Sequence, residues 1–550
     1  MRYATSLDAT VALEAQVQAY YGQGGFPKQG RSLKEKIDEA ERFLAQEIPK
    51  SGIVGVGAAI VYRDAVVMSK GFGLVQASDS SSPVTDKSIF QIGSVSKTMI
   101  AVAVGLLVEE GKVGWRDPVK KHLPWLKLFD KYAEQHLNIG DLLAMNSGLG
   151  SAPDFADVYG AFQTERAFVE ALQYLEPQHS LRAQPEYANI NFIILGQMIE
   201  SVSGQPWDDF LKKRIWEPLG MKNTFASSRL VSSDNQVLNA GHFVCDGELM
   251  GPYDIASAPE AIHSAGRDRD LSAAGTIVSS AKDMATFMRL LLNKGTVGDV
   301  KLLRSASTIA EMIAGKVTTT PDMLELFPKM GLHYSPDGST LAAGYGIDII
   351  GQAIWGYPYF DKSGDLATHQ TRTGFAPTEK LSVILMGNTQ IPGEHTTFYL
   401  DHYRTYVMGI FLDVPKKILD FEYKKWRAAD ILNPPLPEAP RCGLRFWKNP
   451  PVLEMSNELL DTLVGDYITT ISTQFFPKMV VSRSSAGQLS VTLALTSGTL
   501  FYLGEKHDDA SNKLFLADLS REPVLWPAKK TDKGLYEFDL GVIYAKQAAS

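Results

Sequence analysis

The pattern of apolar and polar positions near the start of the chain predicts a helix followed by strands. In SLKEKIDEAERFLAQEI, apolar residues recur three and four positions apart, which predicts an amphipathic helix with Ser32 as its N-terminal cap. The segment GIVGVGAAIVYRDAVVMSKGFGLVQ is rich in β-branched and small residues on either side of Arg63 and Asp64, which predicts two strands joined by a turn. An apolar run follows Ser94, and its continuous apolar surface predicts a helix buried on most sides.

Helical spacing dominates the middle of the chain, and strand-like patterns return later. The clearest helical segments are LNIGDLLAMNSGLG, ERAFVEALQYL, NFIILGQMIESVSG and residues 279–295, where Gly295 supplies a stop. From about residue 340 the segments AGYGIDII, AIWGYPYFDKSG and KLSVILMGNT read as strands, and a last helix is expected around 396–412. Strands at both ends with helices between them predict one sheet that is formed from both ends of the domain.

The C-terminal part of the chain has a different pattern. Six prolines between residues 434 and 451 are typical of a stiff, extended linker. After them, short β-type runs alternate with polar turns, which predicts a small antiparallel barrel or sandwich. The predicted division is an N-terminal lead-in over 1–30, a main domain over 31–415, a Pro-rich linker over 416–456 and a small β domain over 457–550.

Composition then narrows the class of protein. A chain of 550 residues exceeds what one hydrophobic core usually serves, which favours two domains. The net charge of −8 and the scattered Lys and Arg residues argue against a nucleic-acid-binding surface. Two cysteines, Cys245 and Cys442, are too few for a disulfide framework or a zinc ribbon. The N-terminal segment has no signal-peptide core, and the apolar run at 99–108 is too short to cross a bilayer. We therefore expect a cytoplasmic protein with no membrane or nucleic-acid partner; the oligomeric state is not indicated.

Ser94 and Lys97 stand three positions apart where the buried helix is predicted to begin. Residues i and i+3 share one face of a helix, so the amine of Lys97 can reach the hydroxyl of Ser94. A serine hydroxyl is a weak nucleophile until a base removes its proton, and burial or a nearby positive charge lowers the pKa of a lysine toward that task. The S-x-x-K pattern occurs often by chance in a chain of this length, and chance is the better explanation of the pattern alone, so the interpretation depends on other residues.

Two later segments carry side chains suited to the same chemistry. In PEYANINF, Tyr187 and Asn189 precede an apolar helix; a phenol among cations could carry a proton, although packing and helix capping explain this segment alone. In YFDKSGDLATH, Lys362, Ser363 and Gly364 lie on a predicted strand whose backbone N–H groups could bind an acyl oxygen. An exposed turn is the better explanation of that segment when it is taken alone.

The order S-x-x-K, Y-x-N, K-[ST]-G resembles the serine β-lactamases and penicillin-binding proteins, specifically the branch of class C β-lactamases and family VIII carboxylesterases. The Tyr187-Ala188-Asn189 motif stands where class A enzymes have S-D-N, and Lys-Ser-Gly replaces Lys-Thr-Gly while keeping the hydroxyl. The similarity runs from about residue 35 to 410 and includes PVTDKSIFQIGSVSKTMIAVAVGLLVEEGKVGWRDPVKKHLP, LNIGDLLAMNSGLG and AAGTIVSSAKDMATFM. Thr368 departs from the glycine of many relatives, and the C-terminal part is similar to the lipocalin-like β domain of some of them.

This resemblance implies a fold of the α/β (α+β) class, with a central antiparallel sheet flanked by helices, an all-helical subdomain and a small antiparallel β-barrel domain. It also implies acyl transfer through a covalent acyl-enzyme, without a metal or an organic cofactor, on a small-molecule ester or amide. The implied roles are Ser94 as nucleophile, Lys97 and Tyr187 as a proton relay whose base is undecided, Asn189 and Lys362 as substrate-side groups, and Ser363, Gly364 and Asp365 along the oxyanion strand.

Two questions stay open from the sequence. His369 could stand in place of Lys362, as the histidine of H-x-G relatives does, although the spacing to KLSVILMGNT favours Lys362. Hydrolysis of an ester or amide is the first functional interpretation, ahead of a biosynthetic acyltransferase or cyclase, a true β-lactamase and a non-catalytic binding protein.

Overall fold

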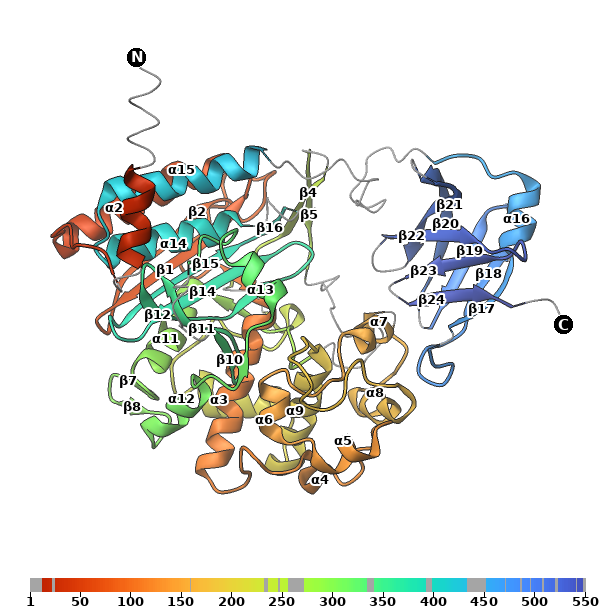
Figure 1. Ribbon diagram of the computed structural model, residues 1–550, viewed down its shortest axis with the longest axis horizontal. Helices are drawn as coiled ribbons and strands as arrows, with labels where there is room; N and C mark the ends of the chain where they lie inside the picture. Colours follow the sequence, from red (N-terminus) through yellow and green to blue (C-terminus); the bar gives the residue numbers. More distant parts are fainter. Residues whose placement is uncertain are drawn as a thin grey trace, which may run out of the picture.

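The computed structural model describes most of the chain (Figure 1). The residues outside the described part are 1–11, 22–24, 159, 232–235, 246–247, 256–271, 334–340, 392–397, 433–451, 470, 485–486, 495, 507–508, 520–522, 541 and 548–550. In the part that is described, no helix is both long and apolar enough to cross a membrane.

A nine-stranded antiparallel sheet forms the centre of the main domain. The strand order is β2-β1-β15-β14-β12-β11-β10-β9, and β13 pairs with β14 beside this path. Strand β1 pairs with β15 from Val56 opposite Gly387 to Tyr62 opposite Leu381, so both ends of the domain build one sheet, as the sequence predicts. The strands are β1 (Gly55–Tyr62), β2 (Ala65–Gly73), β9 (Val317–Thr318), β10 (Ala342–Gly344), β11 (Ile347–Ile354), β12 (Tyr357–Asp361), β13 (Ser363–Asp365), β14 (Gln370–Ala376) and β15 (Leu381–Gly387).

The predicted first helix and hairpin are confirmed. Ser32 caps α2 through a reciprocal capping box with Glu35. Arg63 and Asp64 both have positive φ angles (51° and 71°). Positive φ at both central residues is typical of the tight two-residue turn that joins adjacent antiparallel strands.

Helices cover both faces of the central sheet. Because side chains alternate along β1, Ala58 and Ile60 pack into the apolar cluster that includes α14, while Ala59 and Val61 pack into the cluster that includes α3. The helices in contact with the sheet or its flanks are α2 (Leu33–Glu47), α3 (Ser96–Glu109), α11 (Ala281–Leu292), α12 (Ala306–Met312), α13 (Pro321–Leu326), α14 (Tyr399–Phe411) and α15 (Lys416–Leu432).

Helix α15 corrects the expected start of the linker. Residues 416–432 are helical, and Ile418 and Leu419 are fully buried in the same cluster as α14. The hydroxyl of Tyr423 donates to Glu47 Oε2 at 2.7 Å, which ties α15 to the end of α2. The linker prediction depends on the prolines, the first of which is Pro434; the segment 433–451 of the predicted linker lies outside the described residues.

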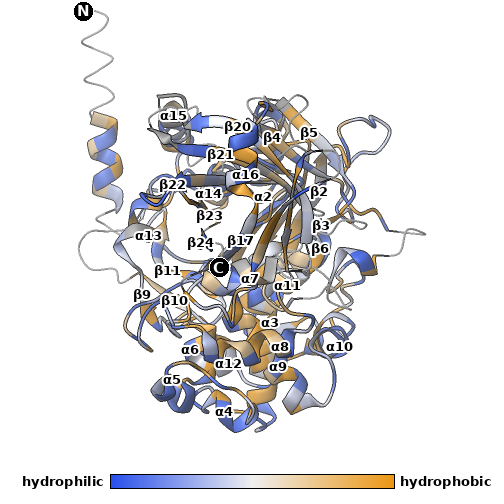
Figure 2. Ribbon diagram, turned by 90° about the vertical axis from the view of Figure 1, so that its right-hand side faces the viewer, coloured by the Kyte–Doolittle hydropathy of each residue, from blue (hydrophilic) through white to orange (hydrophobic). Residues whose placement is uncertain are grey.

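A group of short helices surrounds the buried helix α9 and forms the predicted helical subdomain. Much of α3 and α9 is coloured as hydrophobic in Figure 2, and residues of both helices belong to one apolar cluster. The members are α4 (Val119–His122), α5 (Lys131–His136), α6 (Ile139–Leu143), α7 (Ala152–Val158), α8 (Glu165–Ala171), α9 (Asn189–Ser203), α10 (Trp207–Leu211) and the π-helical turn η4 (Lys212–Trp216).

The C-terminal domain is a closed antiparallel barrel of eight strands, which confirms the predicted small β domain. Its interior holds large side chains such as Tyr467, Phe515 and Trp526, each at most 1% exposed. Helix α16 (Asn457–Leu463) precedes the strands β17 (Gly465–Thr469), β18 (Met479–Arg483), β19 (Leu489–Leu493), β20 (Thr496–Lys506), β21 (Asp509–Leu519), β22 (Pro523–Lys530), β23 (Tyr536–Asp539) and β24 (Ile543–Lys546).

The β17–β18 connection of the barrel reaches the helical subdomain. Phe475 lies with its ring centroid 5.4 Å from that of Phe162 and 6.0 Å from that of Phe168, and all three residues belong to the main-domain core cluster or pack on it. Figure 1 shows this connection extending from the barrel toward α8. The two domains therefore share an apolar contact, centred on Phe475.

Candidate active site

Ser94 lies on a tight turn between a buried strand and a buried helix. Strand β3 (Ile89–Gln91) leads into the 3₁₀ turn η2 (Gly93–Val95), and α3 starts at Ser96 rather than at Ser94 as the sequence predicts. The predicted i, i+3 contact is nevertheless present, because Lys97 Nζ donates to Ser94 Oγ at 3.0 Å. Lys97 is fully buried, and its ammonium also donates to Asn189 Oδ1 at 2.7 Å and to the backbone carbonyl of Ala274 at 2.6 Å.

Tyr187 approaches Ser94 from the helical subdomain. Its hydroxyl lies 2.6 Å from Ser94 Oγ and 3.5 Å from Lys362 Nζ. The two lysine amines lie over its ring, at 5.1 Å for Lys97 and 5.0 Å for Lys362 from the ring centroid. The phenol is therefore placed between two cations and the candidate nucleophile.

The Lys-Ser-Gly segment runs along the turn that carries Ser94. A Cβ atom at Gly364 would lie 2.1 Å from the carbonyl oxygen of Ile92 and 2.8 Å from the backbone nitrogen of Ser94, so only glycine allows this approach. A Cβ at Gly93 would in turn lie 3.1 Å from the backbone nitrogen of Asp365. The backbone nitrogens of Ser94 and Asp365 are thus brought to one place, which is the arrangement that an oxyanion site between these two residues requires.

The hydroxyl of Ser363 is engaged behind the strand. It donates to Asp361 Oδ1 at 3.1 Å, and Asp361 is itself paired with Arg404 at 2.6 Å. Arg404 is fully buried and also pairs with Asp401. Loss of one partner of a buried ion pair costs much free energy, so these pairs fix the end of β12, Lys362 beside it and the strand β13 that carries Gly364.

Burial and neighbouring charge change the pKa values of the central groups. Burial lowers the pKa of Lys97, and the charge of Lys362 lowers it further, while Tyr187 opposes both effects. Burial would raise the pKa of the Tyr187 phenol, but the positive charges of Lys362 and Lys97 outweigh burial and lower this pKa. Burial would lower the pKa of Lys362, yet Asp348 and Tyr187 raise it, so Lys362 stays protonated.

Two carboxylates at the site are not among the residues that the sequence predicts. Asp348 Oδ2 accepts from Lys362 Nζ at 2.5 Å, and a signal for it existed, because an Asp inside the apolar strand segment GIDIIG is unusual. Asp154 Oδ2 accepts from Asn189 Nδ2 at 2.8 Å, and burial raises the pKa of Asp154 to about 6. The sequence SAPDFADVYG gives no sign of which Asp would do this.

His369 does not take the place of Lys362. It is fully buried, its Nδ1 lies 2.9 Å from the hydroxyl oxygen of Thr368, and its ring meets Phe90 edge-on. Burial lowers the pKa of His369 to about 3, so the imidazole is neutral. Lys362 is the residue that the fold brings to Tyr187.

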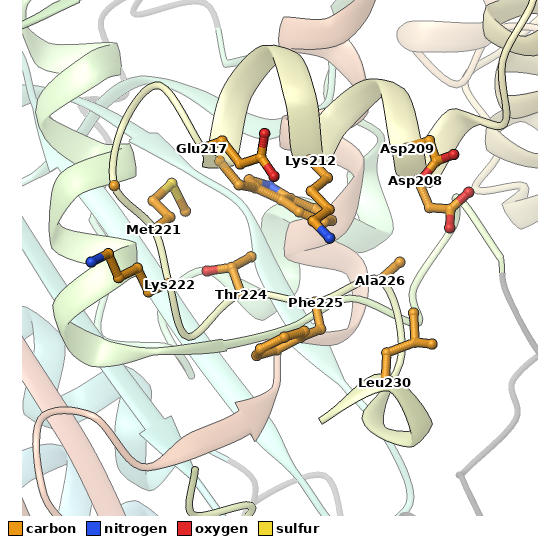
Figure 3. A pocket seen from close by; sticks show the side chains of 12 residues that line it. Asp208, Asp209, Lys212, Glu217, Met221, Lys222, Thr224, Phe225, Ala226 and Leu230 are labelled. Carbon is orange, nitrogen blue, oxygen red and sulfur yellow. The ribbon is translucent and has the colours of Figure 1, made fainter. Parts of the chain in front are cut away.

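A separate hollow of about 570 Å³ lies beside α10 and the π-helical turn (Figure 3). Lys212, Glu217 and Phe225 are among the residues around it, and none of the site residues described above lines it. Across the described ranges, no group of three or more His, Cys, Asp or Glu side chains is arranged to hold a metal ion.

The sheet, the helical subdomain and the S-x-x-K serine at the start of a buried helix place the protein in the class of β-lactamase-like folds. A profile of the Beta-lactamase family matches residues 36–402, which is more than half of the chain, so the protein belongs to this family.

Curated relatives and solved structures agree with this membership. The chain is 28% identical over 289 residues to a protein described as unguisins hydrolase from Aspergillus campestris, covering 51% of each chain. It is 25% identical over 299 residues to a putative D-alanyl-D-alanine carboxypeptidase from Escherichia coli O157:H7, covering 50% of this chain and 68% of the relative. The chain thus spans about half the length of the fungal relative.

The solved structures show the likeness in fold. A penicillin-binding protein homologue from Pyrococcus abyssi, described as octameric, superposes with a TM-score of 0.56 at 19% identity, covering 93% of this chain and 100% of the other. A D-amino acid amidase from Ochrobactrum anthropi superposes with a TM-score of 0.52 at 18% identity, covering 72% of this chain and 99% of the other.

Proposed function

We propose that this protein is a serine hydrolase that forms an acyl-enzyme on Ser94 from a small ester or amide and passes the acyl group to water. The observation that carries the proposal is the position of Ser94 Oγ, 2.6 Å from the Tyr187 hydroxyl and 3.0 Å from Lys97 Nζ. The pKa of Lys97 and the pKa of Tyr187 are both lowered, which makes each a better candidate for the proton acceptor than an ordinary lysine or tyrosine.

In the acylation step, Ser94 Oγ attacks the substrate carbonyl and its proton passes to the Lys97–Tyr187 pair. The bond from Oγ to the carbonyl carbon forms, and the negative oxygen accepts from the backbone N–H groups of Ser94 and Asp365. The tetrahedral species collapses when the bond to the leaving alcohol or amine breaks, and the pair returns the proton to that group. Asn189 accepts from Lys97 and so holds the amine on the Ser94 side.

In the second step, water takes the place of the leaving group. The Lys97–Tyr187 pair accepts a proton from the water, the bond from the water oxygen to the carbonyl carbon forms, and the bond to Ser94 Oγ breaks as the serine regains its proton. Hydrolysis is favoured over transfer to another acceptor because the curated relatives are described as a hydrolase and a carboxypeptidase.

A labelling experiment and an ester assay test the proposal together. We expect a fluorophosphonate to add once to the wild-type protein, as seen in its intact mass, and to leave Ser94→Ala unmodified. We expect hydrolysis of p-nitrophenyl butyrate to fall by about a thousandfold or more in Ser94→Ala, because loss of a nucleophile removes the covalent route.

Ser307→Ala is the matched control, since it removes an exposed serine hydroxyl on α12. The Ser307→Ala variant should react once with the fluorophosphonate and hydrolyse p-nitrophenyl butyrate at the wild-type rate. Equal ester hydrolysis in wild type and Ser94→Ala would overturn the assignment, and a higher product yield with an added alcohol than with water alone would replace hydrolysis by transfer.

A further inference from the structure

Among the described residues of the candidate site, Lys97 and Lys362 are buried, and the carboxylate that pairs with Lys362 is more exposed than the lysine. Lys362 has only 2% of its side chain exposed, whereas its partner Asp348 has 31% exposed. An approaching substrate therefore meets the carboxylate before it meets the ammonium.

The sheet register holds Asp348 in this position. Strand β11 pairs with β12 so that Ile349 stands opposite Asp361, and one step further along the same register Asp348 faces Lys362. Burial alternates at this end of β11, with Ile347 and Ile349 each 3% exposed and Asp348 between them on the other face. The pair is therefore a cross-strand ion pair built into the sheet.

The same arrangement recurs on the other side of Gly364. Arg372 has 4% of its side chain exposed and pairs at 3.0 Å with Asp365, whose side chain is 46% exposed. Arg372 also pairs at 2.6 Å with the buried Asp401. Here again the guanidinium lies behind a carboxylate that faces solvent.

The charges that are exposed around β13 affect which charged substrates the site can bind. Lys97, Lys362, Arg372 and Arg404 are all at most 4% exposed. Accessible ammonium and guanidinium groups are the strongest partners that a protein offers to a substrate carboxylate, and these four groups are buried. Asp348 and Asp365 instead place like charge where such a carboxylate would have to dock, which is unfavourable.

We propose that Asp348 and Asp365 make the β13 side of the site acidic, so that the enzyme selects esters or amides that carry an ammonium group near the scissile bond and rejects those that carry a carboxylate there. This inference rests on the proposed hydrolase function. It identifies a charge class of substrate, with Asp348 and Asp365 as specificity-determining residues.

Two matched substrate series test the inference. The acyl series contains the ethyl esters of β-alanine, butyric acid and succinic acid; the alcohol series contains butyrylcholine, 3,3-dimethylbutyl butyrate and the butyrate ester of glycolic acid. Acid release followed by pH-stat gives kcat/KM for each. In at least one series we expect kcat/KM at low salt to be about tenfold or more higher for the cationic ester than for the anionic ester. The ratio of these two kcat/KM values should fall at high salt.

Two variants connect the preference to the two carboxylates. Asp348→Asn and Asp365→Asn should each lower the ratio of cationic to anionic kcat/KM severalfold, because each removes one exposed negative charge. Asp365→Asn provides a second, independent test, because Arg372 keeps its other buried partner, Asp401, when the charge of Asp365 is removed. Asp299→Asn removes an equal charge from the exposed turn between β7 (Thr296–Val297) and β8 (Val300–Lys301) and should leave the ratio unchanged.

The outcomes separate this inference from the proposed function. A preference for the anionic esters, equal rates within both series, or a ratio that neither variant changes would overturn the charge selectivity. In each of these cases, Ser94-dependent turnover of the neutral esters would keep the hydrolase assignment. Turnover of the neutral esters that does not depend on Ser94 would overturn both.

Discussion

The proposed reaction depends on the balance of charge around one phenol, that of Tyr187. The Tyr187 hydroxyl is flanked by Ser94 at 2.6 Å and by Lys362 at 3.5 Å, with Lys97 close to its ring. Both ammonium groups lower the pKa of Tyr187, whereas Asp348 raises it. A change in either member of the Lys362–Asp348 pair should therefore move the pH dependence of the reaction in a defined direction.

Lys362→Met should move the rising limb of the kcat/KM–pH profile to higher pH. Loss of the positive charge raises the pKa of Tyr187, and the deprotonated relay then forms only at higher pH; a shift of about one unit is expected for a charge at this distance. Asp348→Asn should move the same limb to lower pH. Profiles measured with a neutral ester check both shifts.

The exposed Lys301 supplies the control for this pair, because Lys301→Met removes a positive charge from the edge of the separate hairpin β7–β8. Its profile should coincide with that of the wild type. Shifts of the same sign in Lys362→Met and Asp348→Asn would contradict the assigned charge balance.

Among the elements, the approach of β13 to the turn η2 is the tightest constraint at the site. The strand lies close enough that a Cβ at Gly364 would be 2.1 Å from the Ile92 carbonyl oxygen. Several contacts hold it there, since β13 pairs with β14 along its length and the Ser363 and Asp365 side chains pair with buried partners. The strand cannot yield without disturbing these contacts.

Gly364→Ala should therefore lower kcat for ester hydrolysis, and it should also lower the stability of the protein because the contacts of β13 must shift. The methyl group separates β13 from η2 and moves the two backbone N–H groups apart, and loss of one such donor typically costs about 10²–10³ in kcat. Gly114→Ala is the control, because its Cβ would have 3.4 Å to the nearest atom. Wild-type kcat in Gly364→Ala, measured with p-nitrophenyl butyrate, would argue against an oxyanion site between Ser94 and Asp365.

At the scale of the whole molecule, the two domains meet through an aromatic contact close to the helices that support the site. Phe475 of the barrel connection is 1% exposed and packs on Phe162 and Phe168, which flank the start of α8. Helix α7, just before them in the chain, carries Asp154, the partner of Asn189. The barrel is thus packed against the segment that borders the site.

Phe475→Ala should destabilise the protein by about 3–5 kcal/mol, the usual cost of deleting a buried Phe side chain. Thermal and urea unfolding check this value. Phe129→Ala, which truncates a side chain that is 49% exposed, should stay within about 0.5 kcal/mol of the wild type. Equal stability of the two variants would mean that Phe475 contributes little to the docking of the barrel.

Local signals in the sequence predicted many of the elements and named most of the residues of the candidate site. The Ser32 cap, the Arg63-Asp64 turn and the period-two runs of the barrel each involve residues only a few positions apart, so their physics can be read from the chain. The i, i+3 spacing likewise brought Lys97 to Ser94.

Only the tertiary structure decided how these residues are charged and what the site presents to a substrate. Asp348 reaches Lys362 through a strand register, Asp154 reaches Asn189 across the helical subdomain, and α15 is stabilised by burial against α14 and α2. These contacts join segments that are far apart along the chain, and no periodic pattern in the sequence indicates which distant segments will meet. The sequence by itself therefore determined the family motifs, including the proposed serine and its lysine, because these are local patterns. The tertiary structure decided which charges are buried and which are exposed to solvent, because strand register brings distant segments together.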